Sequence, residues 1–139
     1  MRKPRIYIIG PFRGATEYNR RSNIARAEDA AIDVAKAGAF YRCPHLHSAH
    51  FEGLLTDEYW LGLGIDLLSE CDAAYLVPDA ADAPMCTGGT GPQRAYLLPR
   101  WLSRGSAAEV AWCVARGIPV FDSIRQVELL VAKKAPDAR

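Results

Sequence analysis

The sequence lacks an excess of charge of either sign, and it lacks long apolar runs. Its 17 lysines and arginines face 16 aspartates and glutamates, which leaves a formal net charge of +1 over 139 residues. So neutral a chain has no strong general attraction to nucleic acid polymers or membrane surfaces. No segment approaches the roughly 18 apolar residues that span a membrane, and the run at 6–9 is too short for the core of a signal peptide. We therefore expect neither nucleic acid polymers nor membranes as partners.

The sequence also lacks a cysteine framework. Its cysteines are Cys43, Cys71, Cys86 and Cys113, and no two of them form a C-x-x-C pair. Disulfide-stabilised secreted domains are denser in cysteine. We therefore expect buried free thiols and a cytoplasmic location.

What is present is the composition of an ordinary globular domain, with 50% hydrophobic and 24% charged residues. The length predicts one domain over 1–139. Apolar runs alternate with stretches of helical periodicity: strands are expected at 5–9, 39–43, 73–77 and 118–121, and helices at 19–36, 56–70 and 106–116 and after Ser123. This order predicts the α/β class, a three-layer sandwich with a small parallel sheet of four to five strands.

Residues 79–99 interrupt the alternation. They contain three prolines and three glycines and are longer than a usual connection in an α/β unit. We expect a functional or mobile loop, which would act as a lid over a site at the carboxyl ends of the strands.

The first candidate site segment follows the first expected strand and consists of Gly10, Pro11, Phe12, Arg13 and Gly14. Glycine at a strand end lets a ligand approach the backbone, and an arginine there suits a phosphate or carboxylate. The alternative is a tight turn with a surface arginine. Neither a P-loop nor a GxGxxG fingerprint is present.

The second candidate segment opens the helix expected at 106–116 and contains Ser103, Gly105, Ser106 and Glu109. A helix start with serine and glycine is a natural anion site, and a carboxylate one turn further along can reach a ligand held there. The alternative is a capping box, in which Ser106 and Glu109 only satisfy the helix N-terminus.

The third candidate is Asp66, which periodicity groups with Tyr59, Gly62 and Gly64 on one helix face. The alternative is a solvated aspartate. Asp72, immediately before a strand, is expected to be a turn residue.

The fourth candidate segment contains Cys43, His45, His47 and His50. A zinc site is one interpretation, but one short loop seldom supplies four ligands. Histidines that face a ligand are the preferred interpretation, and no metal is assigned.

Taken in order, these segments resemble the nucleoside 2-deoxyribosyltransferase superfamily over nearly the whole chain. The matching positions form a Tyr-x-x-Gly-Pro-x-x-Gly opening, a Pro-x-His, a Trp…Asp…Leu…Cys-Asp series, and a Ser-x-Gly-x-x-x-Glu followed by Ala and Gly-x-Pro-Val. They are Tyr7, Gly10, Pro11, Gly14, Pro44, His45, Trp60, Asp66, Leu68, Cys71, Asp72, Ser103, Gly105, Glu109, Ala115, Gly117, Pro119 and Val120.

The resemblance implies a small Rossmann-like domain that forms homodimers or larger homo-oligomers, and a reaction that cleaves N-glycosidic bonds. It implies that Glu109 attacks the anomeric carbon, that Asp66 helps to protonate the leaving base, and that Tyr7 lies beside the nucleophile. A carboxylate near an oxocarbenium-like transition state makes chemical sense of this assignment. No metal or organic cofactor is implied.

Ser103 and Arg13 resemble the branch of the superfamily that hydrolyses nucleoside 5′-monophosphates. A hydroxyl at a helix start holds phosphate, whereas a carboxylate would repel it. We therefore expect a small-molecule nucleotide substrate and a nucleotide N-glycosidase. Its predicted substrate-binding residues are Gly10, Pro11, Phe12, Arg13, Gly14, His45, Ser103, Gly105 and Ser106. The alternatives are a transferase that exchanges bases on free deoxynucleosides and a nucleotide-binding module without turnover.

Overall fold

The computed structural model describes residues 2–12, 16–48, 51, 53–78 and 104–134. Several sequence predictions therefore lie outside the described residues: those for Arg13, Gly14, His50, Cys86, Ser103 and the loop at 79–99. Of the helices in the described ranges, none has the length and apolar character to cross a membrane.

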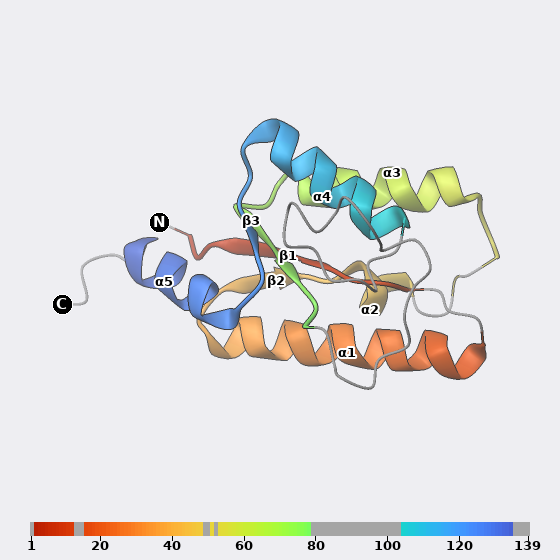
Figure 1. Ribbon diagram of the computed structural model, residues 1–139, viewed down its shortest axis with the longest axis horizontal. Coiled ribbons are helices and arrows are strands. Elements are labelled where there is room, and N and C mark those ends of the chain that lie inside the picture. Colours follow the sequence, from red (N-terminus) through yellow and green to blue (C-terminus); the bar gives the residue numbers. More distant parts are fainter. Residues whose placement is uncertain (1, 13–15, 49–50, 52, 79–103, 135–139) are drawn as a thin grey trace.

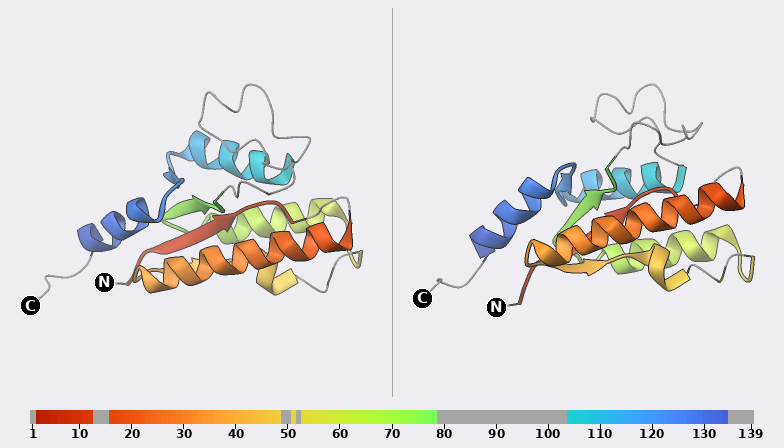
Figure 2. Two further views of the ribbon diagram at one scale, coloured as in Figure 1. Left: turned by 60° about the horizontal axis from the view of Figure 1, so that its bottom comes forward. Right: turned by 90° about the horizontal axis from the view of Figure 1, so that it is seen from below.

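Nine elements alternate along the described chain. They are β1 (Arg5–Ile9), α1 (Glu17–Lys36), β2 (Phe40–Arg42), α2 (Pro44–Ser48), α3 (Asp57–Leu68), β3 (Ala73–Leu76), α4 (Arg104–Arg116), β4 (Val120–Phe121) and α5 (Ile124–Lys134). The strands form one parallel sheet in the order β2-β1-β3-β4. Helices α1 and α5 cover one face, and α3 and α4 cover the other (Figures 1 and 2). The predicted α/β three-layer, Rossmann-like arrangement is confirmed.

The two central strands carry the core. Ile6, Tyr7, Ile8 and Ile9 of β1 are fully buried, and every residue of β3 is buried as well. Strands that are covered by helices on both faces need such continuous apolar runs. Tyr7 lies fully buried in the middle of β1, and its hydroxyl needs a partner inside the protein.

The helix boundaries follow local signals. Thr16 caps α1 by accepting a hydrogen bond from the backbone N–H of Asn19 at 3.1 Å, and Thr56 caps α3 in the same way from Tyr59. Pro44, which in sequence ends a strand, also starts the short helix α2, because proline is favoured in the first turn. The irregular segment predicted from His45 onward is therefore helical as far as Ser48.

Asp72 connects residues near both ends of the described chain to the start of β1. Its carboxylate accepts hydrogen bonds from Arg2 Nη1 and from the backbone N–H of Arg5, both at 2.8 Å, and Lys134 Nζ lies 3.4 Å away. Partial burial raises the pKa of Asp72, but the Arg2 and Arg5 hydrogen bonds and the nearby positive charges outweigh it and lower the pKa to about 2. The expected structural role of Asp72 agrees with these contacts.

We predict that Asp72→Asn lowers the free energy of unfolding by about 1 kcal/mol at pH 7, since solvent screens a pair this near the surface. A lowered pKa stabilises the folded state above the unfolded pKa near 4, and this contribution disappears as the pH falls toward 2. Urea titrations at pH 7 and pH 2.5 should therefore show a clearly larger difference between variant and wild type at pH 7, because at pH 2.5 the unfolded state is already protonated and much of the contribution is lost. Asp29→Asn on the exposed side of α1 is the control, and an equal loss in that variant would contradict the prediction.

Candidate functional site

A tyrosine and a glutamate that lie 102 positions apart in sequence meet beside the sheet. The hydroxyl of Tyr7, in the middle of β1, donates a hydrogen bond of 2.5 Å to Oε2 of Glu109, on α4. The ring of Tyr7 is fully buried, and Glu109 is partly buried. Among the described residues, Glu109 Oε1 has no hydrogen-bond donor. One carboxylate oxygen is therefore fixed while the other is available to a ligand.

Helix α3 closes over this pair at a glycine. A Cβ atom placed on Gly64 would lie 2.7 Å from Glu109 Oε2 and 2.8 Å from the Tyr7 hydroxyl. A Cβ atom essentially never makes contacts that short, so any side chain here would displace the glutamate or the tyrosine. The arrangement therefore depends on β1, α3 and α4 together, and the contact of Gly64 with Tyr7 and Glu109 is one that the sequence does not predict.

The surroundings of Glu109 favour its neutral form. Burial raises the pKa of Glu109 to about 7, and the hydrogen bond from Tyr7 lowers it by a smaller amount. The pKa of Tyr7 is itself raised, first by burial and then by the Glu109 charge. Tyr7 therefore stays protonated and acts as the donor, while Glu109 changes its charge near neutral pH. Carboxyls with a pKa shifted in this way are typical of catalytic sites.

Asp66 lies on a different side of α3 from Gly64. Asp66 and Gly62 are exposed, whereas Gly64 is buried against Tyr7 and Glu109. Two residues along an α-helix differ by about 200° in direction, so Gly64 cannot share the face of Asp66. The predicted grouping of Asp66 with Gly64 is therefore wrong, and no hydrogen bond joins Asp66 to Glu109 within the described part of the chain. The role of Asp66 as proton donor stays a prediction.

The start of α4 differs from the capping-box alternative. The helix begins at Arg104, so Ser106 lies inside the first turn and is 2% exposed. The Glu109 side chain bonds to Tyr7 in place of the helix N-terminus. A capping box requires Ser106 as the N-cap, but α4 begins two residues earlier, so the capping-box alternative is wrong. The Glu109 carboxylate is therefore not used to cap the helix. Gly105 is exposed in the same turn.

The loop after β1 is held by its carbonyl oxygens. Nε2 of the buried His45 lies 3.0 Å from the carbonyl oxygens of both Gly10 and Pro11. Asn23 of α1 donates from Nδ2 to the Phe12 carbonyl oxygen at 3.4 Å. Burial lowers the pKa of His45, so the ring is neutral and its Nε2–H is the donor. His45 uses this nitrogen to position the loop, and its contact with a ligand stays a prediction.

Close packing against β3 leaves no room for a side chain at Gly10. A Cβ atom at this position would lie 2.6 Å from Cγ2 of Val77, next to the end of β3. The glycine that the sequence analysis assigned to ligand approach therefore lets β1 and β3 continue side by side. Contact of Gly10, Pro11 and Phe12 with a substrate stays a prediction.

The structure does not favour the zinc interpretation, because Cys43 and His45 already contact backbone carbonyl oxygens. The Cys43 thiol is buried and points to the Ala27 carbonyl oxygen at 3.9 Å. Burial raises the pKa of Cys43 to about 11, which disfavours the thiolate that zinc requires. His45 Nε2 bonds to the backbone, and His47 is exposed. Within the ranges described above, no three His, Cys, Asp or Glu side chains gather to hold a metal.

Comparisons with known proteins give one structural likeness. No protein-family model matches the chain, and no curated protein matches its sequence. Among solved structures, the chain is similar to a 2-deoxyribosyltransferase from the psychrotolerant bacterium Bacillus psychrosaccharolyticus, with 15% sequence identity and a TM-score of 0.49. The alignment covers 84% of this chain and 69% of that chain. The role of each side chain at the site therefore rests on the geometry of this chain itself.

Proposed function

We propose that the chain hydrolyses the N-glycosidic bond of nucleoside 5′-monophosphates, with Glu109 as the nucleophile. The observation that carries the proposal is the hydrogen bond from the Tyr7 hydroxyl to Glu109, which fixes a partly buried carboxyl whose pKa is about 7. Glycosidic cleavage builds positive charge on the sugar ring, and a carboxylate in a poorly solvated site stabilises that charge strongly. The sequence resemblance independently assigns the same two residues to this role.

In the proposed reaction, Oε1 of ionised Glu109 attacks the anomeric carbon. The bond from that carbon to the base nitrogen breaks, and its electron pair leaves with the base, which takes up a proton. Asp66 is the predicted source of that proton. Water then attacks the anomeric carbon and breaks its bond to Glu109 Oε1, which releases the sugar 5-phosphate and restores the Glu109 carboxylate. The proton that the water loses returns to Asp66, so that both carboxyl groups regain their starting states.

The first turn of α4 supports a phosphate group in the substrate. Glu109 lies five residues from the helix start at Arg104, which is about 7.5 Å along the axis at 1.5 Å per residue. Free N–H groups at a helix start attract anions. A sugar phosphate with its anomeric carbon at Glu109 therefore places its phosphate at the helix start, beside Gly105 and Ser106. Contact of Ser103 and Arg13 with that phosphate stays a prediction from the sequence.

The test is incubation of the purified chain with a panel of nucleoside 5′-monophosphates and the matching free nucleosides, with and without an added acceptor base. We expect free base from the monophosphates alone, and none from a Glu109→Ala variant. Turnover that requires an acceptor base and ignores the phosphate would replace the proposal with the transferase. A thermal shift with nucleotides but no product would replace it with a binding module.

Tyr7→Phe should shift the pH dependence of the reaction. Tyr7 lowers the pKa of Glu109, so removing its hydroxyl raises that pKa and leaves less carboxylate at neutral pH. A hydrogen bond to a charged group is worth about 1.5–3 kcal/mol, or about 1–2 pH units. We therefore expect the rising limb of kcat/KM to move upward by at least about one pH unit, with roughly tenfold less activity at pH 7.

The control for that variant is Tyr75→Phe, which removes a hydroxyl from a buried tyrosine of β3 without touching Glu109. Its pH profile should match the wild type. An unchanged profile in Tyr7→Phe, or an equal shift in both variants, would show that Tyr7 does not set the protonation of Glu109.

A further inference from the structure

The end of β1 and the loop after it have their carbonyl oxygens bonded within the protein. The four successive carbonyl oxygens of residues 9–12 each have a donor. The backbone N–H of Val77 donates to the first at 2.9 Å, Nε2 of His45 lies 3.0 Å from both the second and the third, and Asn23 donates to the last at 3.4 Å. The negative ends of these peptide dipoles are therefore directed into the protein and not toward a ligand.

The backbone N–H of Phe12 is a donor that the protein itself does not use. No described residue accepts a hydrogen bond from it, and Pro11 before it has no N–H. The peptide that joins Pro11 to Phe12 is trans, so this N–H points in the direction opposite to the carbonyl oxygen that His45 holds. Free backbone N–H groups in loops are binding groups for anions.

The sheet order gives the direction of this N–H. His45 belongs to α2, which follows the edge strand β2, and the strands β3 and β4 lie on the other side of β1. A group that points away from His45 therefore points toward the side of β3 and β4. Helix α4 leads into β4, and its first turn lies at the same end of the sheet as the loop after β1 (Figure 1). The free N–H is thus directed toward the side on which the substrate phosphate was placed above.

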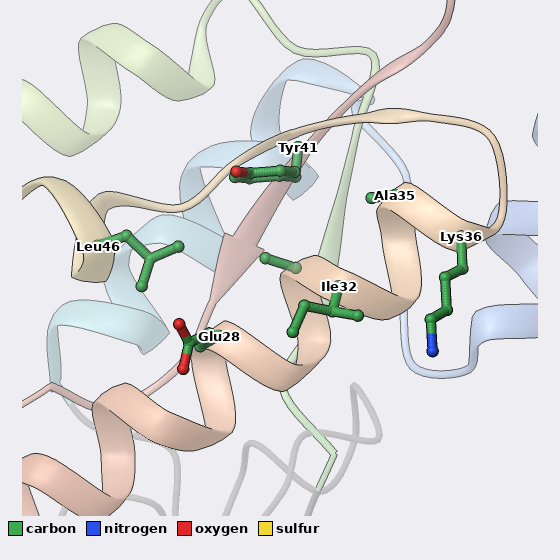
Figure 3. Close-up of a pocket in the computed structure, with 7 residues that line it drawn as sticks. Glu28, Ile32, Ala35, Lys36, Tyr41 and Leu46 are labelled. Atoms are coloured by element: carbon green, nitrogen blue, oxygen red, sulfur yellow. The ribbon is translucent and has the colours of Figure 1, made fainter.

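His45 is itself held firmly enough to fix the loop. It is 5% exposed, and its ring lies 5.7 Å from the ring of Phe12. Leu46, the next residue of α2, packs against the core and faces Ile32 of α1 across a hollow of about 450 Å³ (Figure 3). Burial lowers the pKa of His45 and keeps the ring neutral, and its Nδ1 has no partner among the described residues. The polar contacts of the ring are therefore those of Nε2 with the loop.

We propose that His45 is a positioning residue for phosphate recognition: it holds the Pro11 carbonyl group so that the Phe12 N–H donates a hydrogen bond to a phosphate oxygen of the substrate. The inference rests on the proposed function for the presence of that phosphate. A hydrogen bond to a charged oxygen is stronger than one between neutral groups, and it is lost when the peptide turns over. A free nucleoside gains nothing from this contact. His45 therefore favours phosphorylated substrates through the loop, and this role needs no contact between His45 and the substrate.

The test compares two amide side chains in place of His45. Glutamine places its nitrogen near the position of Nε2 and can donate to the same carbonyl oxygens, whereas asparagine is one bond shorter and cannot reach them. The probes are ribose 5-phosphate and ribose, titrated calorimetrically into the full chain. We expect His45→Asn to raise the Kd of ribose 5-phosphate about tenfold or more and to leave the Kd of ribose unchanged, because only the phosphate loses a charge-assisted hydrogen bond. His45→Gln should bind ribose 5-phosphate within about twofold of wild type.

Two further measurements separate positioning from a general structural effect. His47→Asn makes the same change at an exposed histidine of the same helix and should leave both constants unchanged. In the nucleotide assay, His45→Asn should raise the KM for nucleoside 5′-monophosphates while kcat stays near that of wild type, because the contact between Tyr7 and Glu109 is not altered. Replacing Phe12 with its α-hydroxy acid analogue puts an ester oxygen in place of the N–H and should weaken ribose 5-phosphate binding as His45→Asn does.

Circular dichroism shows whether each variant is folded, and the ester variant decides the question if His45→Asn is not. Equal constants for His45→Asn and His45→Gln, an equal weakening of ribose binding, normal phosphate binding by the ester variant, or a wild type that does not bind ribose 5-phosphate would each overturn the proposal. These outcomes differ from a failure of the proposed function. A chain with the expected constants that releases no base would refute the hydrolysis alone, and a chain that releases base but whose two His45 variants bind alike would refute only the role of His45.

Discussion

Replacing Glu109 with glutamine is expected to abolish turnover while making the folded chain more stable at pH 8. The activity loss should be at least about 10³-fold, because an amide oxygen cannot replace a carboxylate as nucleophile. The shape of the side chain is kept, and the amide oxygen can still accept the Tyr7 hydrogen bond. A variant that is inactive because it unfolds is therefore not the expected outcome.

The gain in stability follows from the direction of the pKa shift. Burial raises the pKa of Glu109 from its ordinary 4.5 to about 7, so the folded state holds this proton over a pH range in which the unfolded state has lost it. The free energy of unfolding then falls as the pH rises from about 4.5 to about 7, by up to about 3 kcal/mol. Glutamine carries no charge to bury. We expect Glu109→Gln to gain about 1–3 kcal/mol over wild type at pH 8, and close to nothing at pH 4.

Urea unfolding at pH 8 and pH 4 measures this difference, and the nucleotide assay measures the activity. Glu70→Gln is the matched control, because Glu70 is exposed just before β3 and should change neither quantity. Equal stability of Glu109→Gln and wild type at pH 8 would show that Glu109 is better solvated than its position implies. A stabilised variant that still releases base would instead remove Glu109 from the chemistry.

The fold follows from local signals that the sequence carries openly. The buried runs at 6–9 and 73–77, the cap at Thr56 and the alternation of strands with helices were enough to predict a parallel sheet with helices on both faces. The sequence does not predict α2, because Pro44 follows an apolar run and there indicates the end of a strand. Proline both ends a strand and starts a helix, and the residues that follow it decide between the two.

The site is harder to predict because its contacts are long-range. Nothing local connects Tyr7 with Glu109, and only the resemblance to a known superfamily brought them together before the structure did. The local pattern at Ser106 and Glu109 pointed instead to a capping box, which failed because α4 begins two residues earlier. The contacts of His45 are long-range in the same way, because the carbonyl oxygens that its Nε2 bonds lie 35 and 34 residues away in sequence. Contacts between residues so far apart in sequence cannot be predicted from the periodicity of hydrophobic residues.

Gly64 shows the same limit, and it supports the second large prediction. Gly64→Ala should lower activity by about 10²-fold, because a shift of the order of an ångström at a reacting group has that effect. The added Cβ would lie 2.7 Å from Glu109 Oε2 and 2.8 Å from the hydroxyl of Tyr7. The Tyr7 ring is fully buried and cannot retreat, so the glutamate must move and its hydrogen bond must break.

Gly62, in the same helix, provides a matched control, since a Cβ there would meet no described atom within 4 Å. Alanine favours a helix over glycine by about 0.5–1 kcal/mol, so Gly62→Ala should be slightly more stable than wild type and fully active. Gly64→Ala gains the same helical stabilisation, but the clash with Glu109 and Tyr7 offsets it. Its thermal stability should therefore stay near that of wild type while its kcat falls. Equal activity of the two variants would mean that α3 does not confine Glu109, and the three-element site described here would lose its support.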